Sequence, residues 1–175
     1  VIGESVQGAS HVRNGMPNQD AWYKLPQAEE NEWFCVAVAD GHGGDKYFRS
    51  QDGAEFAVKL TVNALKKIYT DMVDNGTEDL SFIKRDMEES VPRILIQLWR
   101  KAIDADLKKK PFSEDEWKTL EQKTGKDARK SIEKSPYIAY GATILAVLVT
   151  GKCIFYMQLG DGDIMTVSDE GVVSK

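Results

Sequence analysis

Cysteine and histidine are scarce in this chain, with two of each among its 175 residues. Cys35 and Cys153 lie far apart and lack the paired spacing of a zinc site. Each stands in an apolar, strand-like run, WFCVAVAD and KCIFYMQL, which predicts two buried thiols in a reducing compartment and no disulfide. Neither thiol has the setting of an activated nucleophile.

Long hydrophobic runs are also lacking. The longest, ATILAVLV, has the length of a strand and cannot cross a membrane, and the opening VIGESVQGAS lacks the basic and apolar segments of a signal peptide. The net charge of −5 argues against nucleic acid or an anionic membrane as a main partner. We therefore expect a cytoplasmic protein. Because the sequence starts at Val1 and not at methionine, we expect it to be a trimmed or processed piece.

The chain is long enough for one domain, over residues 1–175, and its pattern of strands, then helices, then strands predicts an α+β fold. Alternating or dense β-branched and aromatic residues predict strands over 2–7, 20–25 and 33–39, with a Gly- and Asn-rich loop between the first two. The last part holds four strand-like runs joined by TGK, GDG and DEG, which predicts an antiparallel meander.

Apolar residues recur at helical spacing over 52–72 and again over 80–107, where Pro92 is expected to kink or divide the helix. A charged region, 108–134, follows. Its SEDE stretch predicts one short helix that starts at Ser113. The many charges favour an exposed excursion of the chain over a binding site.

Carboxylates stand at the ends of strand-like runs in three loops. These are Asp20 in PNQD, Asp40 in ADGHGG, and Asp161 with Asp163 in LGDGD. Oxygen ligands without paired Cys or His suit a hard cation such as Mg²⁺ or Mn²⁺, and neighbouring glycines let an ion or substrate come close. Each loop also has a structural reading, as a strand start, a helix cap or a turn. The flanking glycines favour function at Asp40.

Four of these motifs, in this order, resemble the metal-dependent serine/threonine protein phosphatases of the type 2C family. They are NQDA at 18–21, DGHGG at 40–44, YGATILAVLV at 140–149 and QLGDGDI at 158–164, and DGHGG is the most specific of them. The stretch SHVRNGMPNQDA looks more like a divergent, bacterial branch of that family. The resemblance implies a four-layer αββα sandwich, two antiparallel sheets flanked by helices.

The resemblance also implies roles for the loop residues. Asp20 and Asp40 would bind two Mn²⁺ or Mg²⁺ ions, with the Gly41 carbonyl as a further ligand and Asp161 at a third, weaker site. Two bridged ions can acidify a water that attacks the phosphoryl group. His42 would be the general acid that protonates the leaving alkoxide. The implied substrate is a phosphorylated protein.

Three features depart from the family pattern. Arg13 lies seven residues before Asp20, so Arg13 or His11 is a candidate to contact phosphate, with a solvated loop residue as the alternative for Arg13. Gln19 stands where many members have glutamate. Two later aspartates that complete the family's metal site are missing, so we expect this sequence to be the N-terminal portion of the domain.

The leading prediction is hydrolysis of phosphoserine and phosphothreonine in proteins by a metal-activated water. A catalytically inactive, phosphatase-like binding module is the alternative from another class, and the missing aspartates favour it. A hydrolase of other phosphoesters that uses the same metals is a third possibility.

Overall fold

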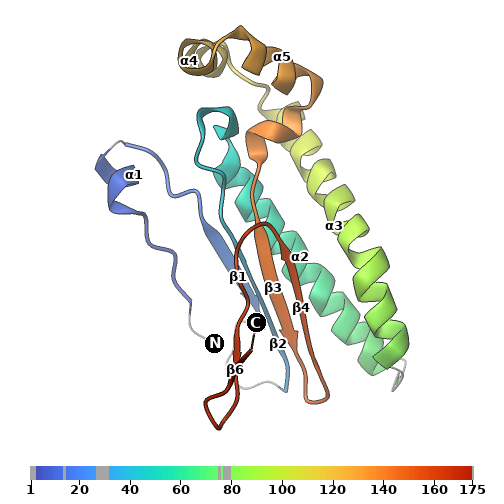
Figure 1. Ribbon diagram of the computed structural model, residues 1–175. Helices are drawn as coiled ribbons and strands as arrows, with labels where there is room; N and C mark the ends of the chain where they lie inside the picture. The colour runs from blue at the N-terminus through green and yellow to red at the C-terminus, as the bar shows by residue number, and fades with distance from the viewer. Residues whose placement is uncertain (1–2, 14, 27–31, 75, 77–79, 175) are drawn as a thin grey trace.

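The computed structural model describes residues 3–13, 15–26, 32–74, 76 and 80–174, and the fold below refers to these. Its centre is a four-stranded antiparallel sheet in the order β1-β2-β3-β4 (Figure 1). The strands are β1 (Ala21–Leu25), β2 (Phe34–Ala39), β3 (Ile144–Val149) and β4 (Ile154–Leu159). β1 and β2 confirm the strands predicted over 20–25 and 33–39. β2 and β3 are neighbours although about a hundred residues separate them in sequence, and this pairing brings the DGHGG and YGAT motifs together.

Two long helices lie on one side of this sheet (Figure 1). α2 (Ser50–Asp74) packs on the sheet, and α3 (Leu80–Lys109) packs against α2. Both confirm the predicted helices, and Pro92 lies inside α3 without dividing it. The apolar stripe of α2 and the alternate residues of β2 and β3 form the main core, which includes the fully buried Val62 and Leu148.

The charged region after α3 forms a second hydrophobic cluster, so the prediction of an exposed excursion is wrong. It folds as α4 (Glu114–Thr124) and α5 (Lys126–Lys134), followed by the 3₁₀ helix η2 (Pro136–Tyr140). The predicted start at Ser113 is confirmed, since its side chain and that of Glu116 form a capping box. Trp117 and Ile132 are buried on the inner sides of the two helices together with Tyr140. Most charged side chains of α4 and α5 are exposed on the outer sides of these helices.

Other local predictions also need correction. Residues 3–8 form no strand, and the first helix, α1 (Ala9–Arg13), lies in the predicted loop. The C-terminal meander is interrupted. β3 and β4 form a hairpin, but the two-stranded sheet of β5 (Thr166–Val167) and β6 (Val173–Ser174) is separate from it. Cys35 is buried as predicted, whereas Cys153 lies in the turn before β4 and is only half-buried.

The described residues thus form an α+β fold, as predicted, consistent with an α+β sandwich. The sheet face opposite α2 is apolar and open to solvent at several positions, such as Val38, Ile154 and Tyr156. None of the helices in the described ranges has the length and apolar character needed to cross a membrane.

Candidate active site

Asp40 is fixed at the end of β2 by the strand beside it. Its backbone N–H donates to Thr143 Oγ1 at 3.1 Å, and its carbonyl accepts from the Thr143 N–H at 2.8 Å. The hydroxyl residue of the YGAT motif therefore holds the backbone of Asp40 on both sides. This contact depends on the β2–β3 pairing, in which Val38 lies opposite Leu145.

Asp20 is brought to Asp40 by the antiparallel pairing of β1 and β2. Ala21 lies opposite Ala39, so the residues just outside this pair, Asp20 and Asp40, are neighbours across the sheet. Burial is the largest cause that raises the pKa of the Asp20 carboxyl, and the charge of Asp40 and a hydrogen bond between the two side chains raise it further. Two carboxylates this close repel each other when both are ionised. A cation between them would relieve that repulsion.

A cleft of about 360 Å³ opens where the three acidic loops meet. Asp20, Asp40 and Asp161 all line it, beside Thr143. The Gly160–Gly162 turn reaches the cleft by close packing: a Cβ on Gly160 would lie 2.7 Å from Thr143 Cγ2, and one on Gly162 2.8 Å from Leu145 Cδ1. With φ of 120°, Gly160 also has a backbone conformation that side chains rarely allow.

Gly41 and His42 occupy the turn that follows Asp40. Gly41 is buried, and a Cβ there would come within 2.5 Å of the Gln19 carbonyl oxygen, so only glycine fits. The His42 N–H donates to the Gly141 carbonyl at 3.0 Å, and the imidazole lies against Tyr47 with the ring centroids 4.8 Å apart. The His42 side chain is exposed and does not line the acidic cleft.

The two candidate phosphate contacts differ in position. His11 in α1 is half-buried, and its charge lowers the pKa of Asp20, which places it within electrostatic range of the acidic pair. Arg13 ends α1 as an exposed residue and does not line the cleft. The structure therefore brings Asp20, Asp40 and Asp161 to one cleft, with His11 nearby, and leaves Arg13 apart.

The acidic residues at the cleft supply some, but not all, of the ligands of a hard cation. Within the part of the chain that the structure describes, no three His, Cys, Asp or Glu side chains converge closely enough to hold a metal ion. Mg²⁺ and Mn²⁺ are bound by oxygen ligands, and Mg²⁺ sites commonly keep several waters with only one or two carboxylates. The adjacent pair Asp20 and Asp40 meets that smaller requirement.

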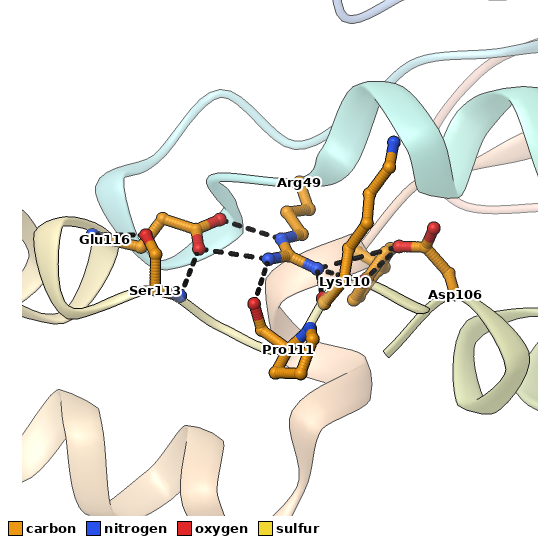
Figure 2. A network of polar contacts seen from close by, with 7 residues as sticks. Arg49, Asp106, Lys110, Pro111, Ser113 and Glu116 are labelled. Atoms are coloured by element: carbon orange, nitrogen blue, oxygen red, sulfur yellow. Dashed lines mark hydrogen bonds and ion pairs between the residues drawn. The ribbon is translucent and has the colours of Figure 1, made fainter. Parts of the chain in front are cut away.

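Sequence reasoning missed Arg49, which ties the turn after DGHGG to α4. Figure 2 shows its guanidinium bound to both carboxylate oxygens of Glu116, at 2.7 and 3.0 Å, and to the carbonyls of Lys110 and Pro111. It also donates to the Tyr140 hydroxyl at 2.8 Å and lies 3.6 Å from Asp106. A lone Arg in a charged sequence carries no signal for this role, because all its partners lie 57 or more residues away.

Comparison with known proteins decides the family. Residues 7–175 match the family model described as Protein phosphatase 2C. The chain belongs to the protein phosphatase 2C family. No curated protein and no solved structure matched it.

Membership of the protein phosphatase 2C family supports a phosphatase, with phosphoproteins as the class of substrate and Mn²⁺ or Mg²⁺ as the usual cofactor. The Cys35 thiol does not suggest a covalent mechanism. Cys35 is fully buried, and burial raises the pKa of its thiol to about 11.

Proposed function

We propose that this protein hydrolyses phosphoserine and phosphothreonine in proteins at the acidic cleft. The observation that carries the proposal is the meeting of Asp20 and Asp40, from two strand ends, beside the DGHGG turn. The repulsion between the two carboxylates favours a divalent cation there, with the Gly41 carbonyl and Asp161 as further ligands. Bound in the cleft, such a cation would acidify a water and neutralise charge on the phosphoryl group.

The chain's own residues would orient the reaction. Thr143 fixes the backbone of Asp40, so the carboxylate needs little rearrangement to receive ligands. His42 would protonate the alkoxide of the departing serine or threonine, and Tyr47 and Gly141 pack against its ring and limit its movement. His11, near Asp20, would attract the phosphate dianion, and Arg13 is the second candidate for this contact.

The test compares the wild-type protein with Asp40→Asn. We expect Mn²⁺ binding measured by isothermal titration, and phosphate release from a phosphoserine peptide, to be present in the wild type. Both should fall by a hundredfold or more, on the order of 3 kcal/mol, in Asp40→Asn, because the amide removes the shared charge. Asp169→Asn, in the exposed turn between β5 and β6, is the matched control and should behave as wild type.

Three results would contradict the proposal. Equal Mn²⁺ binding by the wild type and Asp40→Asn would show that the cation does not bind in the acidic cleft. Binding of the phosphopeptide without phosphate release would identify the alternative, a phosphatase-like binding module. Phosphate release from small phosphoesters alone would indicate a different substrate class.

A further inference from the structure

A second cleft, of about 380 Å³, lies between the DGHGG turn and α4. The loop before β1 and the glycines of DGHGG form one wall, and the N-cap and inner side of α4 form the other. Its lining includes Pro17, Gln19, Phe48, Leu120 and the charged residues discussed below. It is distinct from the acidic cleft, with which it shares no lining residue.

One wall of this second cleft carries a buried acceptor without a partner. Gln19 is 7% exposed, and its Nε2 donates to Ser50 Oγ at 2.7 Å and to the His42 carbonyl at 3.4 Å. Its Oε1 is buried and has no hydrogen-bond partner among the described residues. Leaving such an oxygen unpaired costs roughly 1–3 kcal/mol. A donor that reached Gln19 Oε1 from the cleft would remove this cost.

The charges around the cleft favour a donor that is positively charged. Three carboxylates, on Asp45, Asp115 and Glu116, line it together with one cation, Lys123. Lys123 Nζ binds Asp45 at 2.8 Å, and Glu116 is held by Arg49. Asp115, exposed in the first turn of α4, adds a negative charge at the mouth. An anion is disfavoured, because Ser113 already caps α4 by accepting from the Glu116 N–H.

We propose that this second cleft binds an arginine side chain of the phosphoprotein substrate. The inference rests on the proposed phosphatase function. A guanidinium supplies several N–H donors in one plane, so a single group can donate to Gln19 Oε1 and pair with a carboxylate such as Asp115. Its flat face suits the aromatic ring of Phe48. A lysine ammonium would meet fewer of these contacts.

The linings of the two clefts are joined by short stretches of backbone at the ends of β1 and β2. Gln19 precedes Asp20 directly, and Gly43 follows Asp40 by three residues, so each connecting segment spans at most about 10 Å. An extended peptide advances about 3.3 Å per residue. The arginine is thus expected within about three residues of the phosphoserine.

The test uses phosphoserine peptides in which arginine, or its neutral isostere citrulline, stands at each position within about three residues of the phosphoserine. Binding is measured by fluorescence anisotropy with a phosphonate analogue that cannot be hydrolysed, and kcat/KM with the phosphoserine form. At one position we expect arginine to bind about tenfold tighter than citrulline and to raise kcat/KM similarly.

Asp115→Asn should remove most of this preference and leave hydrolysis of a small phosphoester unchanged. Asp127→Asn, in the first turn of α5 and outside the cleft, is the matched control and should keep the preference. Equal binding of arginine and citrulline peptides at every position, or a preference that survives in Asp115→Asn, would overturn the inference. If the phosphoserine peptides are still hydrolysed in that case, the proposed function stands. Arginine-dependent binding without any hydrolysis would contradict the proposed function alone.

Discussion

His42 owes its position to a neighbour that has no side chain. A Cβ on Gly141 would lie 2.5 Å from His42 Nδ1 and 3.0 Å from Tyr47 Cδ1, so Gly141→Ala must displace the imidazole. If His42 protonates the leaving alkoxide, the loss should depend on the leaving group. We expect kcat for a phosphoserine peptide to fall about tenfold or more, and kcat for p-nitrophenyl phosphate, whose leaving group needs no proton, to change little.

Steady-state kinetics of both substrates on one preparation would decide this. Gly151→Ala is the control, since a Cβ there meets no atom within 4 Å. Equal losses on the two substrates would show that Gly141→Ala distorts the whole site, and would leave His42 without a specific role as an acid.

Among individual residues, the sequence predicted the aspartates of the acidic cleft but not the contacts of the residues around it. Asp20, Asp40 and Asp161 could be found because each follows or precedes a strand, and strand ends that pair must lie together. The unpaired oxygen of Gln19 and the contacts of Arg49 could not be found in this way. Both result from α4 packing beside the DGHGG turn, and no local pattern reports that contact.

α4 is attached to the DGHGG turn by the ion pair of Arg49 and Glu116. Burial alone raises the pKa of Glu116, but hydrogen bonds from Arg49 and Ser113 outweigh burial and hold that pKa below its ordinary value of 4.5. A carboxyl whose pKa is lower in the folded state stabilises the fold above its unfolded-state pKa, and this contribution is lost as pH falls through the folded-state value.

Glu116→Gln should therefore lower the free energy of unfolding by about 1–3 kcal/mol near pH 7, with a smaller difference from wild type near pH 3. Urea unfolding at the two pH values measures this. Glu133→Gln, which breaks an exposed pair with Arg129 within α5, should cost about 0.5 kcal/mol or less. A difference for Glu116→Gln that is the same at both pH values would show that its cause is packing and not charge.

Among the elements, long and strongly patterned segments were predictable. Dense β-branched residues predict β2, and apolar residues at helical spacing predict α2. The second helix of the charged region, α5, was missed because its inner side needs only Ala128 and Ile132, which charged residues surround in sequence. The five-residue α1 has no apolar period to reveal it. β5 belongs to a separate sheet from β4, and the GDG turn between them packs on Thr143 in a tertiary contact that no local pattern reports.

The described residues contain two hydrophobic clusters, one between the sheet and α2 and one among the end of α3, α4, α5 and η2. The two clusters meet along α2: Phe56 stacks on Tyr140 with the ring centroids 6.5 Å apart, Trp99 Nε1 donates to the Gly53 carbonyl at 2.9 Å, and Arg49 binds both sides. Parts of a protein that each keep a core of their own can open separately. The acidic cleft belongs to the first cluster, and the proposed arginine site lies at the border of the two.

Hydrogen exchange would show whether the two clusters open independently. Ile132→Ala and Leu148→Ala are a matched pair, because both side chains are fully buried, one in each cluster, and each loss is expected to cost about 2–5 kcal/mol. We expect Ile132→Ala to speed exchange in α4, α5 and η2 while β2 and β3 stay protected, since the sheet keeps its own core. Leu148→Ala should speed exchange in the strands and, because α4 is anchored on the turn after β2, in α4 as well. Uniform acceleration in both variants would instead mean that the clusters unfold as one unit, so that a ligand bound beside α4 stabilises the acidic cleft directly.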